Sequence, residues 1–285
     1  MKKLLRATTI ALLAGFGFTF ATLKTGPFPT QTDLDNALFS AIRSGNTNTT
    51  EIANLLKDGA NVNATDEQGK TPLMKAVLAN DLAFVKTLLK AKADLNKCDN
   101  VNCTALTWAV YKENLPIIKA LLSASADPNK DEGHPLREAV AHNRLDIIKI
   151  LLKAGANPSL GHLDSTPLIM AAEKGYMNVA QTLINAKANL NGQNYRGDTA
   201  LIAALYNYNG TIAIGKMLIA AGANPNLSEY IYDNTPLMMA AMEGHVDVVR
   251  DLIAAGADTT LKNKDGKAAL DYAATEEIKA LLKTK

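Results

Sequence analysis

The sequence is poor in the residues from which active sites are usually built. Its 285 residues include two cysteines, four histidines and one tryptophan. It contains no Gly-x-Ser-x-Gly nucleophile motif, no phosphate-cradling glycine loop and no His-Glu-x-x-His zinc motif. These absences argue against the common hydrolase, nucleotide-binding and metalloprotease classes. We expect no catalytic residue, no cofactor and no metal site.

Runs of basic residues are also missing. The formal net charge is +2, but Lys2, Lys3 and Arg6 lie at the extreme N-terminus, and without them 27 basic residues face 28 acidic ones. A nucleic-acid-binding surface needs a basic face that displaces counterions from phosphates. We therefore expect no nucleic-acid partner. With 47% hydrophobic residues, the chain is long enough to bury a core.

Only the N-terminus combines a basic segment with a long uncharged stretch. It reads MKKLLRATTIALLAGFGFTFATLKTGP, in the order typical of a secretory signal peptide. We expect residues 1–21 to be this signal, residues 22–33 to be a linker, and the mature protein to lie in the periplasm of a bacterium. The alternative is an uncleaved anchor in the inner membrane, although residues 7–23 are short and diluted by Thr and Gly for a hydrocarbon core of about 30 Å. Membrane contact is expected only in that case.

A repeated pattern organises the rest of the chain. The copies begin at Thr71, Thr104, His134, Thr166, Thr199 and Thr235, and they read TPLMKAV, TALTWAV, HPLREAV, TPLIMAA, TALIAAL and TPLMMAA. Their starts are separated by 33, 30, 32, 33 and 36 residues, a spacing that indicates a repeat architecture. A worn copy, NALFSAI, precedes them, and a shortened one, AALDYAA, follows.

Each copy predicts a pair of short helices. Thr caps the first helix, and Pro is tolerated in its first turn. The Leu and Ala positions form an apolar stripe, and Gly or Asn at the tenth position provides a left-handed C-cap, as at Asn80, Asn143, Gly175 and Gly244. A second apolar helix follows and ends in GAN or KAD. One such pair cannot bury its apolar face alone, but stacked pairs can.

The pattern TPL…A…GH…VV…LL…GAD, most complete in residues 235–258, resembles the ankyrin repeat. The resemblance implies an all-α solenoid of stacked helix pairs with short β-hairpin-like loops. It covers residues 34–285 as one domain, with seven helix pairs and a shortened C-terminal repeat. The usual His after TPL is replaced by Met74, Thr107, Arg137, Ile169, Ile202 and Met238. The hydrogen bonds that this His makes between neighbouring repeats are therefore in doubt.

Both cysteines fall in one predicted turn. Aligned on the repeats, Cys98 and Cys103 flank residues 99–102, so their Cα atoms are expected within disulfide range. In an exported chain they would form a local disulfide. A redox pair is the alternative, but the spacing is not Cys-x-x-Cys and no helix N-terminus directly follows the first Cys to lower its pKa. His134, His142 and His162 could approach one another, yet their spacing matches no known metal site. His245 is the family's inter-helix His.

The aromatic residues are unevenly placed, and they suggest the binding surface. Five of the eight tyrosines fall between residues 195 and 232. In ankyrin repeats the loops and the exposed side of the first helices line the concave binding face. Tyr, Trp and Arg dominate the binding energy of interfaces. The predicted partner-binding residues are Trp108, Tyr111, Tyr195, Arg196, Tyr206, Tyr208, Tyr230 and Tyr232. For Trp108 the alternative is simple packing between repeats.

The sequence therefore indicates a non-enzymatic protein-binding module. We expect it to act in the periplasm as an inhibitor or protective partner of another exported protein. A secreted effector that acts on a host protein is the second hypothesis, because ankyrin repeats often serve that way in intracellular bacteria. A metal or redox enzyme is the third. The identity of the partner is not encoded in any motif.

Overall fold

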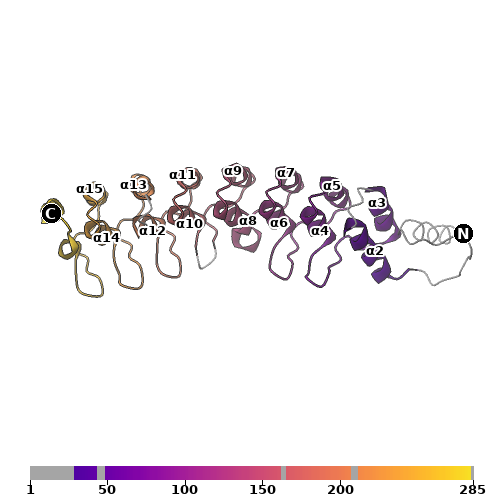
Figure 1. The fold of residues 1–285 in the computed structure, drawn as a ribbon, viewed down its shortest axis with the longest axis horizontal. Coiled ribbons are helices and arrows are strands. Elements are labelled where there is room, and N and C mark those ends of the chain that lie inside the picture. The colour runs from indigo at the N-terminus through magenta and orange to yellow at the C-terminus, as the bar shows by residue number, and fades with distance from the viewer. Residues whose placement is uncertain (1–28, 44–48, 162–164, 207–210, 284–285) are drawn as a thin grey trace, which may run out of the picture. The chain divides into compact units, whose positions relative to one another are not determined.

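A computed structural model describes residues 29–43, 49–161, 165–206 and 211–283 of the chain (Figure 1). The signal peptide expected at residues 1–21 and most of the linker lie outside these ranges, as do Tyr208 and His162. So do residues 44–48 and 207–210, in the segments where the first and sixth copies carry two residues more than the other copies. No helix in the described part of the chain is both long and apolar enough to cross a bilayer.

The first helices begin where the Thr positions predict. The hydroxyl oxygens of Thr71, Thr104 and Thr235 each accept a hydrogen bond from a backbone N–H three residues later, at 3.2–3.3 Å. A second hydrogen bond runs in the opposite direction, from the backbone amide of the Thr to the side chain three residues later. Thr107 Oγ1 accepts from the Thr104 amide, and Met74 Sδ accepts from the Thr71 amide. Three of the residues that replace the family's His, Met74, Thr107 and Met238, thus cap their own helices.

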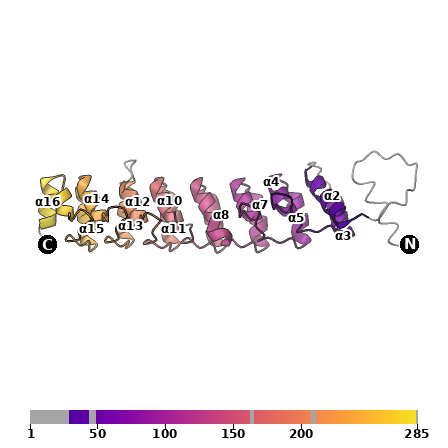
Figure 2. The same ribbon diagram turned by 90° about the horizontal axis from the view of Figure 1, so that it is seen from below.

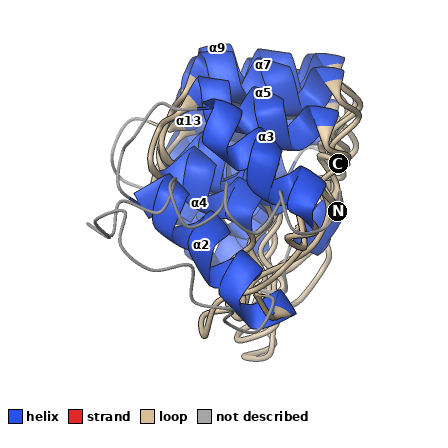
Figure 3. Ribbon diagram, turned by 90° about the vertical axis from the view of Figure 1, so that its right-hand side faces the viewer, coloured by secondary structure: helices blue, strands red, loops and turns tan. Residues whose placement is uncertain are grey.

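The described residues contain 15 α-helices and no strand (Figure 3). The first helices are α2 (Gln31–Arg43), α4 (Pro72–Leu78), α6 (Ala105–Tyr111), α8 (Lys130–Ala141), α10 (Pro167–Glu173), α12 (Ala200–Tyr206) and α14 (Pro236–Met242). The second helices are α3 (Thr49–Asp58), α5 (Leu82–Lys90), α7 (Leu115–Ser123), α9 (Leu145–Lys153), α11 (Met177–Asn185), α13 (Ile212–Ala220) and α15 (Val246–Ala254). A 3-10 helix, η1 (Ala269–Tyr272), and α16 (Glu276–Lys283) form the shortened last repeat.

The chain divides between Asp131 and Glu132 into two compact units. In the first unit α4 packs on α6 and α5 on α7; in the second unit α10, α12 and α14 pack in sequence, as do α11, α13 and α15. Within each unit the first helices form one row, the second helices another, and the loops project from the first row (Figures 1 and 2). The Leu of each TPL-type copy, such as Leu73 or Leu201, is at most 1% exposed and fills the space between the rows.

The fourth repeat departs from the others at its start. The short loop before His134 is absorbed into α8, which spans 12 residues, whereas α4, α6, α10, α12 and α14 span seven each. Asp131, Glu132 and Gly133 have φ values of 52°, 52° and 74°, so the first turn of α8 is not a right-handed helix. The division between the two units falls within this turn.

A ladder of side-chain oxygens connects neighbouring repeats where the sequence repeats Asn. Asn63 Oδ1 accepts from the Asp94 amide, Asn191 Oδ1 from the Asn224 amide and Asn226 Oδ1 from the Asp258 amide, each at 2.8 Å. These bonds join one repeat to the next through a backbone donor. Neighbouring repeats are therefore connected by hydrogen bonds that do not involve the family's His.

Candidate functional site

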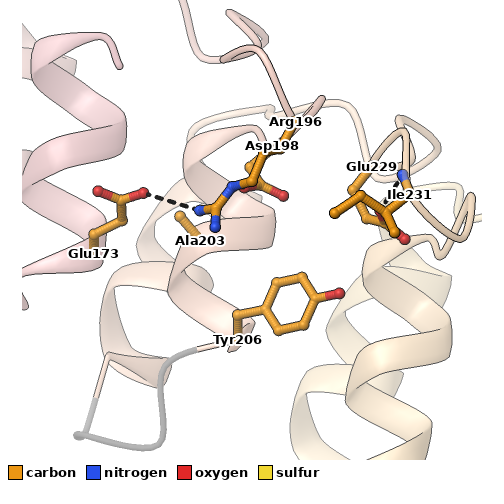
Figure 4. Close-up of a pocket in the computed structure, with 7 residues that line it drawn as sticks. All are labelled: Glu173, Arg196, Asp198, Ala203, Tyr206, Glu229 and Ile231. Atoms are coloured by element: carbon orange, nitrogen blue, oxygen red, sulfur yellow. Dashed lines mark hydrogen bonds and ion pairs between the residues drawn. The ribbon is translucent and has the colours of Figure 1, made fainter. Parts of the chain in front are cut away.

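A hollow of about 480 Å³ opens on the loop side of the second unit (Figure 4). It lies between the end of α10, the loop before α12, the face of α12 and the loop before α14. Its lining residues are Glu173, Arg196, Asp198, Ala203, Tyr206, Glu229 and Ile231. Most of these side chains are polar or charged, and they come from three successive helix pairs.

The loop before α12 is held in place by Asn194. Its side-chain Oδ1 accepts from the backbone amides of Arg196 and Asp198, each at 2.9 Å. Gly197 closes the turn with φ +82°, and a Cβ built there would lie 2.6 Å from the ring of Tyr230. Glycine adopts this positive φ without strain, and any side chain at this position would clash with Tyr230. The turn therefore fixes Arg196 and Asp198 at the edge of the hollow.

The loop before α14 is one residue longer, and Glu229 takes the role of Asn194. The Glu229 amide donates to the Asn234 carbonyl, five residues on, whereas the Asn194 amide donates to Asp198, four residues on. The Glu229 carboxylate accepts from the amides of Ile231, Tyr232 and Asn234 at 2.6–3.1 Å. Glu229 is only 1% exposed. Its side chain has one methylene more than Asp or Asn, and this extra length lets the carboxylate reach the amides of the longer loop.

Arg196 connects the acidic residues on one side of the hollow. Its Nε lies 2.9 Å from Asp198 Oδ2 and its guanidinium lies 3.7 Å from Glu173 Oε1 (Figure 4). The guanidinium also lies 5.9 Å from the ring centroid of Tyr195. Asp198 is nearly buried and is also bonded by the Asn194 amide group. The arginine is therefore engaged by two carboxylates and an aromatic ring of its own chain.

Burial and neighbouring acidic residues both oppose ionisation of the groups in the hollow. Burial raises the pKa of Glu173, the charge of Asp198 raises it further, and Arg196 and Lys174 offset this only in part. Burial also raises the pKa of the Tyr206 hydroxyl, with further contributions from Glu229, Asp198 and Tyr232. Both shifts disfavour additional negative charge at this position.

The predicted aromatic residues of the second unit lie at or near the hollow. Tyr206 lines it directly, and its ring lies across from Arg196 and beside Ile231 (Figure 4). The exposed fractions of these residues are 63% for Tyr195, 47% for Tyr206, 55% for Tyr230 and 55% for Tyr232. Tyr230 packs over Gly197 and donates its hydroxyl to Gln193 Oε1 at 3.3 Å. The loop that carries the tyrosines also exposes Ile231, at 54%.

In the first unit, Trp108 has a structural partner. Its indole N–H donates to Asp99 Oδ2 at 2.9 Å, and Lys70 lies 3.2 Å from the same oxygen and over the indole ring. Burial alone would raise the pKa of Asp99, but hydrogen bonds from the Cys103 amide, Trp108 and Lys70 hold it low. Tyr111 packs edge-on against Trp108 at 5.8 Å and is 54% exposed. The indole N–H of Trp108 is therefore bonded within the fold, whereas Tyr111 remains accessible.

The two cysteines flank the predicted turn but are not joined by a disulfide in the structure. The Asp99 amide donates to the Cys103 carbonyl at 3.0 Å, which closes the turn as expected. Burial, followed by the charge of Asp131, raises the pKa of the Cys98 thiol. A raised pKa opposes thiolate formation, so the geometry gives no support to a reactive redox pair. The disulfide itself stays a prediction.

The described histidines do not gather. His142 lies beside Glu138, with Nδ1 3.5 Å from Oε1, and His245 is the N-cap residue that precedes α15. Across the described ranges, no group of three or more His, Cys, Asp or Glu side chains is arranged to hold a metal ion.

The family model for ankyrin repeats matches residues 12–99, 81–162, 159–229 and 209–284. The chain therefore belongs to the ankyrin-repeat family. Such repeats typically bind other proteins, and the proteins built from them are in general non-catalytic interaction scaffolds. The predicted fold class is confirmed.

Relatives and a solved structure agree with this assignment. The ankyrin repeat protein YahD of Escherichia coli (strain K12) is 36% identical over 94 residues, which are 32% of this chain and 46% of YahD. The B-cell lymphoma 3 protein homolog of Mus musculus is 34% identical over 85 residues, 30% of this chain and 18% of that protein. The match thus spans less than half of either relative. The crystal structure of the Bcl-3 ankyrin repeat domain superposes with a TM-score of 0.62 at 26% identity, over 76% of this chain and all of that one.

Sequence reasoning selected the tyrosines and Arg196 but missed the acidic residues beside them. Glu173 ends α10, whereas Arg196 lies on the next loop, so their proximity depends on the stacking of two repeats. Glu229 stands where other repeats have Asp or Asn, in a copy whose spacing is longer than the rest. The Glu at this position and the longer spacing are both visible in the sequence. Together they could have identified Glu229 as the residue that supports this loop.

Proposed function

We propose that this chain binds another exported protein in the bacterial periplasm, through the tyrosine-rich surface around the hollow, and acts as its inhibitor or protective partner. The observation that carries the binding proposal is the set of four tyrosines and Ile231, each roughly half exposed or more, on adjoining loops and α12. Folding alone gives no reason to place large apolar side chains there, because they bury little area and promote self-association. The basic and uncharged N-terminal segment supports export.

The proposal predicts that Tyr206→Ala weakens capture of the partner. The side chain is 47% exposed, so its loss should remove about 1–3 kcal/mol of binding free energy and little folding stability. Crosslinking in intact cells, followed by identification and titration of the captured protein, measures the change. Lys149→Ala, an exposed position on α9, is the matched control and should leave capture unchanged.

Two outcomes would oppose the proposal. If Tyr206→Ala unfolds the protein instead of weakening capture, the ring belongs to the core. If the chain is found in the medium or in host cells instead of the periplasm, the effector hypothesis replaces the periplasmic one. Fractionation of cells that express the full chain separates the two locations.

A further inference from the structure

The hollow in the second unit carries an excess of negative charge. Three of its seven lining residues are acidic and one is basic, which gives a formal charge of −2. The single cation, Arg196, is held by Asp198 and Glu173 within the wall itself. An acidic ligand would have to displace these contacts and approach Glu229 and Glu173. A cationic ligand, in contrast, would be attracted by the net negative charge that remains beside Arg196.

The acidic residues differ in what their oxygens do. The Glu229 carboxylate accepts three backbone amides, and the Asp198 carboxylate is bound by Arg196 and Asn194. Glu173 is the most accessible of the three, with 39% of its side chain exposed and Arg196 at a long 3.7 Å. Burial raises the pKa of Glu173, so the ionised form of this carboxyl group is the one that a neighbouring cation would stabilise.

One aromatic ring, that of Tyr206, completes the wall. Tyr206 lines the hollow, and Tyr232 is close enough to contribute to the raised pKa of the Tyr206 hydroxyl. The faces of tyrosine rings attract Lys and Arg side chains. The volume, about 480 Å³, lies within the range of about 300 to 1,000 Å³ that small ligands occupy in proteins. It can hold one long side chain with part of the backbone that carries it.

We infer that the hollow binds a basic side chain, Lys or Arg, presented by an extended segment of the partner protein. The ammonium or guanidinium group lies between Glu173 and the ring of Tyr206, and the aliphatic stem of the side chain lies against Ala203 and Ile231. The inference rests on the proposed function, since it assumes that a protein binds at this surface. It adds the chemical identity of the group that the surface recognises.

A selection from random peptides tests the inference even while the partner is unidentified. Phage-displayed dodecapeptides are selected on the full chain and sequenced, and the same is done on Glu173→Arg. The wild type is expected to enrich Lys or Arg at one fixed position of the selected peptides. Glu173→Arg reverses the charge at the mouth of the hollow and is expected to enrich Asp or Glu at that position instead.

Measuring the affinity of one selected peptide then tests whether the preference for a basic residue comes from the hollow. A peptide with Arg at the enriched position is used. Replacing this Arg by citrulline, which is neutral and of similar shape, should weaken binding to the wild type about tenfold or more. With Glu173→Gln the same replacement should cost less than about threefold, because the carboxylate is gone. Glu277→Gln on α16 removes an equal charge elsewhere and should keep the tenfold difference.

The outcomes separate the inference from the proposed function. In one outcome, Tyr206→Ala weakens binding of the selected peptides, but the peptides carry no basic residue at a fixed position or tolerate citrulline. This result would overturn the inference and leave binding at this surface intact. If selection yields no peptide, or none that Tyr206→Ala weakens, the surface is not a binding site and both proposals fail.

Discussion

Glu173 illustrates how the burial of a single ionisable residue can oppose folding. Its carboxyl group ends α10 beside Arg196, Asp198 and Lys174, and burial raises its pKa above the ordinary value of 4.5. The folded state therefore binds this proton more tightly than the unfolded state does. Between the two pKa values, the free energy of unfolding falls as pH rises.

We predict that Glu173→Gln is at least as stable as the wild type at pH 7 and that its relative stability grows as pH rises from about 4 to 7. Gln removes the cost of ionising a partly buried carboxyl group, a cost that is absent at low pH. Thermal unfolding followed by circular dichroism across this pH range provides the measurement. A variant that is clearly less stable than the wild type at pH 7 would show that the contact with Arg196 outweighs the burial of Glu173.

The cysteine pair gives a second prediction at the residue scale. In protein recovered from the export compartment, Cys98 and Cys103 should resist alkylation until a reductant is added. The experiment requires denatured protein, because Cys103 is 8% exposed and burial alone would protect it. Labelling of both thiols without reductant would exclude the disulfide. Even if formed, this bond closes so short a loop that it should contribute about 2 kcal/mol at most.

At the scale of elements, the helix pairs were predictable and the wall of the hollow was not. The caps at Thr71, Thr104 and Thr235 and the positive φ values of Asn80 and Gly175 follow from local chemistry, which the sequence carries directly. The meeting of a residue from one repeat with a residue from the next depends on how the pairs stack. Local pattern holds no information on that geometry.

The loop before α14 allows the element-scale prediction. Glu229→Ala leaves the amides of Ile231, Tyr232 and Asn234 without their acceptor, and should lower the free energy of unfolding by about 1–3 kcal/mol. Because the loop carries Tyr230 and Tyr232, partner capture should weaken as well. Urea denaturation measures the first effect. Asp258→Ala, an exposed acid at another repeat boundary, is a control with a smaller expected loss, and equal losses would contradict the special role of Glu229.

At the scale of the whole molecule, contacts are made between neighbouring pairs, so stability should be local. Leu201→Ala removes a fully buried side chain from α12 and should cost about 2–5 kcal/mol. Hydrogen exchange of the amides in α10 to α14 should accelerate, while that of α4 to α7 stays unchanged. Uniform acceleration along the chain would show that the protein unfolds as a single cooperative unit instead.

The Asn ladder also bears on how such a chain can change its length. Each step pairs an oxygen of one repeat, such as Asn191 Oδ1, with a backbone amide of the next, such as that of Asn224. The donor is the same whatever side chains the next repeat carries. A tandem duplication of one whole repeat, about 33 residues, would supply both the acceptor oxygen and the donor amide of this hydrogen bond. A partial duplication would not. Recombination can therefore add or delete whole helix pairs, and each copy can then acquire surface residues of its own.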